Sequence, residues 1–437
     1  MSIEKKYVQI VSELTDIAKK RTREERYTAL GFTSNLDLLC DFSTEKLSSL
    51  LEQYLPNGKL EEMKAAKLIT CIEELLETMV FFCRSGIGGE VDITGTEVMK
   101  DTFRWTNGMG GTGVQAAMAL QRIGCPSLVH LTDDSGEVCK LLDLPGIYVA
   151  SSEGKLIGTK AVKQTQEQEV HAIVQFRKGD VIRLGEQEVT IPTSNRLILT
   201  KITVNETVPF YKPFFDYIAD EGRHVSSYVL SSFNCLQQKK VLADRLQKAK
   251  ESIMAYHRAN PAGVVFFEDA HYHNKEIREM CMNQLYPEVD IVSLNEEELA
   301  YTLESYGMEL DLEDAESLVR GIEALRKKFS MKKGMIVHTK DFSAYIGERL
   351  DTDIEAGLIC GNLLATAKAM NGWYGTMEQI EALLQYPLSE KGMAFRKRAA
   401  EASWGQDVII VPTRYVDRPP YTIGLGDSFV AGVQMCF

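Results

Sequence analysis

Hydrophobic positions in the second half of the chain follow two alternating spacings. Segments with apolar residues every three or four positions, typical of helices with one buried face, are separated by short apolar runs typical of buried strands. The predicted helices cover residues 239–258, 274–285 and 296–306, and the predicted strands cover 196–200, 225–234, 263–270, 289–295, 334–339 and 407–413. This alternation predicts an α/β domain with a mostly parallel sheet and helices on both faces, whose ligands bind beyond the carboxyl ends of the strands.

The first half of the chain shows a different pattern, with apolar and polar residues alternating one by one between Gly or Asp turns. Residues 88–98, 146–164 and 171–191 have this pattern and are predicted to form antiparallel hairpins. We expect them to form a smaller β-rich lid domain inserted into the larger domain. The expected boundaries are 34–44, 85–111 and 149–195 for the lid, and 1–33, 45–84, 112–148 and 196–437 for the large α/β domain.

Composition narrows the class of protein. The chain has 437 residues and a net charge of -13, from 49 Lys and Arg against 62 Asp and Glu, which disfavours nucleic-acid binding. Its nine cysteines include no CxxC pair, so neither a zinc site nor a disulfide framework is indicated. No segment has the run of about 20 apolar residues that a membrane span needs. We therefore expect a cytoplasmic protein, a monomer or small homo-oligomer, with no membrane or nucleic-acid partner.

The segment "YTIGLGDSFVAG" near the carboxyl terminus carries candidate chemistry. It places Gly424, Gly426 and Asp427 just before a helix predicted to begin at Ser428. Amides at a helix start have no partner within the helix and carry partial positive charge, so this turn would hold a phosphate, with Asp427 as a base. The alternative is that Asp427 is only an N-cap, a role for which Asp is a preferred residue.

A second glycine-rich segment, "TNGMGGTGVQAAMALQRIG", allows three interpretations. Gly108, Gly110 and Gly113 have the GxGxxG spacing of a dinucleotide site, and Asp133 follows Gly113 by 20 residues. The preceding "DTFRW" is a poor buried strand, however, which the dinucleotide fingerprint requires. The glycines could instead expose helix amides to a polyhydroxylated or anionic ligand, or only permit tight helix packing.

These two segments together resemble the signatures of the ribokinase-like carbohydrate kinase superfamily. The order of motifs is similar to the ADP-dependent glucokinase and phosphofructokinase family, and further matching pieces are "GFTSNLDLL", "HAIVQFRKG", "FFEDAHYHNKEIR", "SLNEEELA" and "GMIVHTKDFSAYI". The resemblance implies a ribokinase-like large domain with a β-rich lid. It also implies transfer of a phosphoryl group from a nucleotide, ADP giving AMP, to a hydroxyl of fructose 6-phosphate or glucose.

The resemblance assigns roles to individual residues. Asp427 is the implied catalytic base, and the backbone amides of Gly424, Leu425, Gly426 and Asp427 form the implied anion hole. The implied sugar-binding residues are Asn35, Asp37, Gly110, Gly111 and His171. The implied nucleotide-binding residues are His338, Thr339 and Gly426.

The implied metal site uses Asn295 and Glu298 of an NxxE motif, which would organise Mg²⁺ mainly through water. Without the family, the same residues are an ordinary helix N-cap and the third residue of a capping box. Glu268 matches the acid of the family's HxE motif, although Phe266 stands where that motif has histidine. No GxxxxGK[ST] loop is present, so the amides of another turn would have to hold the phosphates.

The acceptor is left open by the sequence. Fructose 6-phosphate needs a cluster of Arg or Lys for its phosphate, and Lys160, Arg177 and Lys178 are candidates, although they could equally be solvated lid charges. Three other functions also stay open: an ATP-dependent sugar kinase of the same fold, a weakly active sugar or nucleotide sensor, and a dinucleotide-dependent oxidoreductase.

Overall fold

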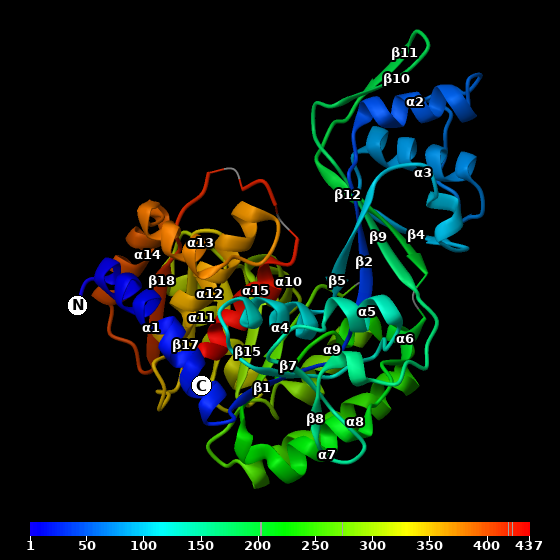
Figure 1. Ribbon diagram of the computed structural model, residues 1–437. Coiled ribbons are helices and arrows are strands. Elements are labelled where there is room, and N and C mark those ends of the chain that lie inside the picture. Colours follow the sequence, from blue (N-terminus) through cyan, green and yellow to red (C-terminus); the bar gives the residue numbers. More distant parts are fainter. Residues whose placement is uncertain (202, 273, 418, 422) are drawn as a thin grey trace.

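The computed structural model describes residues 1–201, 203–272, 274–417, 419–421 and 423–437, which form a larger and a smaller lobe (Figure 1). Within these residues a ten-stranded sheet runs through the larger lobe in the order β18-β17-β16-β15-β14-β13-β1-β6-β7-β8. Neighbouring strands from β16 to β7 are parallel, and β17, β18 and β8 join antiparallel. The strands are β1 Tyr27–Leu30, β6 Ser127–Val129, β7 Ile147–Ala150, β8 Leu156–Ile157, β13 Val225–Leu230, β14 Val264–Glu268, β15 Ile291–Asn295, β16 Gly334–His338, β17 Phe342–Gly347 and β18 Asp407–Pro412.

Both faces of this sheet are covered because its central strands are apolar at consecutive positions. In β14, Val264 and Phe266 contact one helical layer, whereas Val265 and Phe267 contact the other. The first layer contains α1 Ile3–Arg23, α4 Thr112–Arg122, α5 Gly136–Leu141, α12 Ile354–Asn371, α13 Met377–Ala382 and α15 Leu425–Val433. The second contains α7 Lys212–Glu221, α8 Lys239–Ala259, α9 Lys275–Leu285, α10 Glu296–Glu304, α11 Ala315–Lys328 and α14 Glu390–Glu401. The predicted α/β fold is confirmed.

The smaller lobe is built on a six-stranded sheet in the order β3-β4-β12-β9-β2-β5. Its strands are β2 Asn35–Cys40, β3 Leu68–Ile69, β4 Gly89–Ile93, β5 Trp105–Gly110, β9 Val170–Phe176 and β12 Asn195–Lys201. A separate hairpin, β10 Val181–Leu184 with β11 Gln187–Thr190, projects from its far end (Figure 1). The short α6, Val204–Thr207, follows β12.

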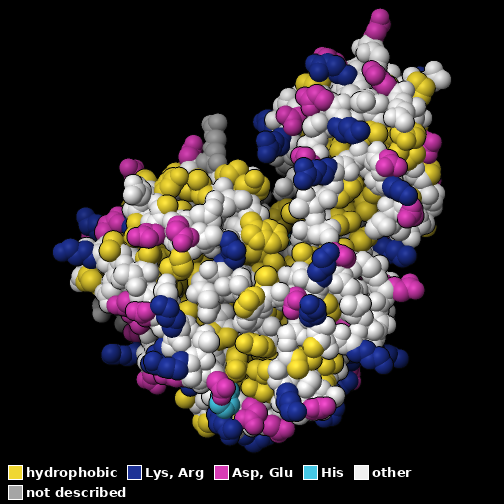
Figure 2. Space-filling view, in the orientation of Figure 1, with side chains coloured by type: hydrophobic (Ala, Val, Ile, Leu, Met, Phe, Trp, Pro, Cys, Tyr) yellow, Lys and Arg dark blue, Asp and Glu magenta, His cyan; other side chains and the backbone are white. Residues whose placement is uncertain are grey.

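One face of the six-stranded sheet is covered by helices and the other is turned toward the larger lobe. Helices α2 Thr44–Tyr54 and α3 Ile72–Ser85 pack on β10 and β12. Along β9 the residues Val170, Ala172, Val174 and Phe176 are buried; on the opposite face His171 is half-buried, Ile173 is buried and Gln175 is exposed. Figure 2 shows the hollow that separates this lobe from the larger one.

The lobe boundaries differ from the predicted ones. Residues 45–84 were expected in the large domain, but the helices of this range, α2 and α3, lie in the smaller lobe. Residues 196–200 were expected in the parallel sheet, yet β12 pairs with β9 and β4. Residues 146–164 were expected in the lid, whereas β7 and β8 form an edge of the ten-stranded sheet. Residues 88–98 form no hairpin, since β4 pairs in parallel with β3 and β12. An amphipathic pattern shows which face of a helix or strand is buried, but it does not show which sheet that face packs against.

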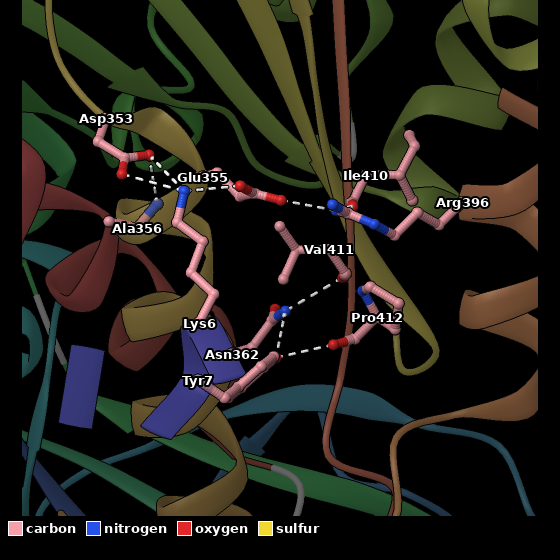
Figure 3. A network of polar contacts seen from close by, with 10 residues as sticks. All are labelled: Lys6, Tyr7, Asp353, Glu355, Ala356, Asn362, Arg396, Ile410, Val411 and Pro412. Carbon is pink, nitrogen blue, oxygen red and sulfur yellow. Dashed lines mark hydrogen bonds and ion pairs between the residues drawn. The ribbon is translucent and has the colours of Figure 1, made fainter. Parts of the chain in front are cut away.

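Helix α12 is fixed at the centre of the first layer by polar contacts with α1 and β18 (Figure 3). Tyr7 donates a hydrogen bond to the Pro412 carbonyl over 2.7 Å, and Asn362 donates to the Val411 carbonyl over 3.3 Å. Glu355 accepts from Lys6 over 2.6 Å and pairs with Arg396 over 2.7 Å. Although α12 is strongly apolar, no helix in the described part of the chain is long and apolar enough to cross a membrane.

Candidate active site

The residues with candidate chemistry gather where the two lobes face each other. The carboxyl ends of β14, β15 and β16 and the start of α15 supply one side, and β2, β5 and β9 of the smaller lobe supply the other. This is the edge at which ligands bind in parallel α/β sheets.

Helix α15 begins at Leu425, three residues earlier than the predicted start at Ser428. Gly424 is its N-cap, with a φ of 67°, a left-handed conformation that suits glycine. Asp427 is therefore the third residue of the helix and not its N-cap, so the N-cap alternative is wrong. The amides of Leu425, Gly426 and Asp427 belong to the first turn, where backbone N–H groups have no carbonyl partner within the helix.

Asp427 is surrounded by charges of both signs. Burial raises the pKa of its carboxyl group, while the charge of Lys368 and a hydrogen bond with Thr112 lower it, and the net result lies above the usual value. Asp37 of the smaller lobe raises the pKa further, and His338 lowers it. A carboxylate whose pKa is raised in this way is suited to accept a proton from a substrate hydroxyl.

The predicted sugar-binding residues form one hydrogen-bonded group in the smaller lobe. Asp37 lies opposite both Gly108 of β5 and His171 of β9 in the sheet register. Asp37 Oδ1 accepts a hydrogen bond from Asn35 Nδ2 over 2.7 Å and lies 3.0 Å from His171 Nδ1. Burial alone would lower the pKa of His171, but Asp37 raises it above its usual value, so the imidazole acts as a donor.

Gly110 and Gly111 are required by the close approach of β2 to β5. A Cβ atom at position 110 would lie 2.1 Å from Asn35 Nδ2 and 2.4 Å from Asp37 Oδ1. Gly111 has a φ of 100°, and a Cβ there would lie 2.2 Å from the Thr33 carbonyl oxygen. Gly110 therefore adjoins Asn35 and Asp37, whereas Gly111 adjoins Thr33.

The dinucleotide alternative does not fit this geometry. Gly108 and Gly110 lie within β5, which pairs antiparallel with β2 in the smaller sheet. The dinucleotide fingerprint instead needs a strand of the parallel sheet that leads into a glycine turn and a helix. Asp133 is fully buried, and its Oδ1 accepts a hydrogen bond from the Ser135 amide.

The predicted metal-site residues lie at the ends of β14 and β15. Asn295 and Glu298 form a capping box at the start of α10, with reciprocal hydrogen bonds of 2.9 Å. Burial and the charge of Glu268 raise the pKa of Glu298 to about 7, even though its hydrogen bond from Asn295 lowers it. Glu268 Oε2 is buried and has no hydrogen-bond partner among the described residues. Such crowded, under-partnered carboxylates fit a divalent cation nearby.

A metal ion at these residues would have to be held mainly through water. The described part of the chain contains no group of three or more His, Cys, Asp or Glu side chains close enough to hold one ion directly. A hard ion such as Mg²⁺ commonly keeps several of its waters, which suits this arrangement. Phe266 is fully buried in the core, and the side chain beside Glu268 is that of His338, with Nε2 3.2 Å from Glu268 Oε1.

The predicted nucleotide-binding residues are only partly brought together. A Cβ at Gly426 would lie 3.6 Å from His338 Cε1, so these two residues are neighbours. Burial by itself would lower the pKa of His338, but the hydrogen bond and charge of Glu268 raise it above its usual value. The Thr339 hydroxyl is used in the turn after β16, where it donates to the Phe342 carbonyl and accepts from two amides.

The basic residues predicted to hold a sugar phosphate are divided by the structure. Arg177 and Lys178 line a cleft of about 1420 Å³ between the smaller lobe and the segment around Tyr421. Lys160 is exposed and does not line this cleft. Arg196 of β12, which sequence reasoning missed, lines it with them.

Three further polar residues of the site were also missed. Asn205 donates to Asn35 Oδ1 over 3.1 Å and so helps to fix the side chain of Asn35. Lys368 and Gln115 are buried beside Gly424, and their side chains form a hydrogen bond of 2.6 Å. The available signal for Lys368 was a lone positive charge within the apolar run 354–370, and Gln115 lies within the second glycine-rich segment, two residues after Gly113.

Comparison with known proteins agrees with this geometry. The family described as "ADP-specific Phosphofructokinase/Glucokinase conserved region" matches residues 26–434. The chain belongs to this family. An "ADP-specific phosphofructokinase" of Pyrococcus furiosus is 25% identical over 94% of the chain and 96% of the relative. An "ADP-dependent glucose/glucosamine kinase" of the same organism is 25% identical over 91% of both.

A solved structure shares the fold at lower identity. It is described as "ADP-dependent kinase complex with fructose-6-phosphate and ADPbetaS", and it matches with a TM-score of 0.73 and 20% identity. The match covers 99% of this chain and 97% of that structure. The resemblance inferred from the motifs is thus confirmed at the level of family and fold.

Proposed function

We propose that this protein is a Mg²⁺-dependent sugar kinase that transfers a phosphoryl group from ADP to a hydroxyl of fructose 6-phosphate. The observation that carries the proposal is the position of Asp427. It stands in the first turn of α15, among free amides, and interacts electrostatically with Asp37 of the sugar-binding group in the other lobe. This supports a base and an anion hole that face the acceptor site.

The reaction follows from these positions. Asn35, Asp37 and His171 orient the acceptor by hydrogen bonds to its hydroxyls, since a carboxylate accepts and an imidazolium donates. Asp427 accepts the proton of the attacking sugar hydroxyl. The oxygen of that hydroxyl forms a bond to the β-phosphorus of ADP, and the bond between the β-phosphorus and the oxygen that bridges to the α-phosphate breaks. The amides of Gly424, Leu425, Gly426 and Asp427 hold the charged phosphoryl oxygens, which oriented dipoles do without reorganisation. AMP and the phosphorylated sugar are the products.

Glu268, Asn295 and Glu298 would hold the Mg²⁺ ion through its water shell. When bound, such an ion neutralises phosphate charge and orients the diphosphate. The crowded carboxylates and the unpartnered Glu268 Oε2 support this assignment.

ADP as the donor is supported by family membership and by the nucleotide analogue in the related structure. Gly426 and His338 adjoin the candidate metal residues and would meet the donor there. Thr339 would contribute through its backbone, because its hydroxyl is already engaged in the turn.

The acceptor assignment rests on charge in the cleft. Arg177, Lys178 and Arg196 line it together with Asp41, Glu45 and Asp180, and the three cations among these residues suit a sugar phosphate. One observation favours glucose as a second candidate. Glu90 of β4 is exposed and raises the pKa of His171, so its negative charge acts on the predicted sugar-binding residues. A carboxylate there would repel a sugar phosphate but not an uncharged sugar.

A product assay tests the proposal. ADP and ATP are crossed with fructose 6-phosphate, glucose and other sugars in the presence of Mg²⁺, and AMP, ADP and phosphosugar are measured. We expect AMP formation that depends on fructose 6-phosphate and ADP. Turnover with ATP alone would refute the donor assignment. Sugar-induced stabilisation without turnover by any pair would refute the kinase proposal and favour a sensor.

A further inference from the structure

Lys368 is a buried cation that none of the assigned roles explains. It lies near the carboxyl end of α12, and only 6% of its surface is exposed. Its Nζ donates a hydrogen bond to Gln115 Oε1 over 2.6 Å and lies 4.2 Å from the centre of the Tyr374 ring. Lysine is almost never fully buried in proteins without a paired or functional reason.

The ammonium group lies directly behind the candidate anion hole. A Cβ atom at position 424 would lie 2.4 Å from Lys368 Nζ and 2.3 Å from Gln115 Oε1. Gly424 is thus required by this pair as well as by its left-handed φ. Among the described residues Gln115 is the hydrogen-bond acceptor of the ammonium, which leaves two of its three N–H groups without an acceptor in that part of the chain.

The charged and titratable groups near Lys368 and Asp427 come from α15, β2, β16 and the segment that follows α12. Asp427 of α15 and Asp37 of β2 are the carboxylates that act on it, and Tyr374 follows α12. Gln115 of α4 is neutral. His338 of β16 lowers the pKa of Asp427 through its charge.

The pKa of the Lys368 ammonium depends on its burial and on two carboxylates. Burial lowers the pKa of Lys368 to about 8, while Asp427 and Asp37 raise it. Lys368 is therefore largely protonated at neutral pH.

We propose that Lys368 is a positioning residue of the phosphoryl-transfer site, whose buried ammonium keeps Asp427 ionised and adds fixed positive charge behind the turn 424–427. The inference rests on the proposed kinase function. A cation in a low-dielectric site acts on a nearby carboxylate far more strongly than at the surface. It lowers the pKa of a carboxyl group within about 4–6 Å by roughly 1–3 units.

The test is the pH dependence of kcat/KM in three variants. In Lys368→Met, the acid limb that reports ionisation of the base is expected to move up by about one unit or more, so that kcat/KM at a fixed pH on that limb falls about tenfold. KM for ADP is expected to stay within about threefold, because the amides and metal residues remain. Gln115→Glu is isosteric and preserves the hydrogen bond to Nζ, and its carboxylate offsets the positive charge of the ammonium. The acid limb of this variant is therefore also expected to move to higher pH.

Tyr374→Phe is the matched control. It removes only a hydroxyl that donates to Gln115 Oε1 over 3.3 Å, and the charge and the ring remain. Its acid limb is expected to stay at the wild-type pH. Wild-type limbs in both Lys368→Met and Gln115→Glu would overturn the inference, as would an equal shift in Tyr374→Phe. If Lys368→Met does not fold, Gln115→Glu decides alone.

A measurement without turnover separates this inference from the proposed function. The Asp427 carboxyl carbon is titrated by ¹³C NMR in aspartate-labelled protein, and its signal is assigned by its loss in Asp427→Asn. An upward displacement of the Asp427 titration in Lys368→Met and Gln115→Glu supports the inference even if no sugar is phosphorylated. An unchanged titration overturns it even in an active kinase.

Discussion

Replacement of Lys368 by methionine should raise the free energy of unfolding while it lowers kcat/KM. The pKa of this lysine falls from the usual 10.5 to about 8 because the side chain is buried. A pKa change of this size corresponds to about 3 kcal/mol of unfavourable free energy for holding the charged form in the folded protein at pH 7. Methionine has a similar volume and carries no charge, so it removes this cost.

The sign and the pH window follow from the two pKa values. Above about 10.5 the lysine is neutral in both the folded and the unfolded protein, and its burial costs nothing electrostatically. As the pH falls toward 8, the unfolded chain binds the proton first, and stability is lost. The cost is about 2 kcal/mol at pH 9 and below about 1 kcal/mol at pH 10.

The assay is urea unfolding of the wild type and of Lys368→Met at pH 7 and pH 10. The hydrogen bond to Gln115 and the contact with Tyr374 are lost in the variant, which offsets about 1 kcal/mol of the gain. We therefore expect the variant to be more stable by about 2 kcal/mol at pH 7, and this difference to decrease by about 2.5 kcal/mol by pH 10. A difference that is equal at the two pH values would refute the claim that burial lowers the pKa of Lys368 in the folded protein.

Three further predictions concern the metal, the acceptor and the lid. Glu298→Gln should weaken the apparent Mg²⁺ affinity about tenfold with an unchanged melting temperature, because glutamine preserves the capping box; a lower melting temperature with an unchanged Mg²⁺ titration would instead show a purely structural role. Arg196→Ala should raise KM for fructose 6-phosphate about tenfold and leave KM for glucose unaltered, and equal changes for both sugars would argue against a phosphate contact. Because Asp37 raises the pKa of His171 above 6.5, their pairing stabilises the protein at low pH and is lost as the pH rises through the raised value. His171→Asn should therefore lower the melting temperature more at pH 5.5 than at pH 8.5, and the reverse order would contradict the pairing.

Much of the large domain was predictable because its signals are local. The apolar runs that became β14, β15 and β16 are short and bounded by polar residues, and their ends carry Glu268, Asn295 and His338. Parallel strands end at the same edge of a sheet, so the meeting of these residues follows from the pattern alone.

The remaining features depend on contacts between distant parts of the chain. Helices 44–54 and 72–85 are amphipathic, and their pattern does not say which sheet they cover. Lys368 interrupts an apolar helix, and only the fold shows that Gly424 and Asp427 lie beside it. The start of α15 was misplaced because a left-handed Gly424 is a backbone property that the residue permits but does not impose.

The position of Asp427 is the central claim, and one comparison tests it most directly. Asp427→Asn is measured beside the wild type for sugar-dependent formation of AMP from ADP, and ADP affinity is measured in parallel by calorimetry. The amides of the turn 424–427 persist in the variant, and only the proton acceptor is lost. We predict a loss of about 10²–10⁴ in kcat, the range of general-base catalysis, with ADP affinity within about threefold of wild type. A variant with near wild-type kcat would contradict the assignment of Asp427 as the base.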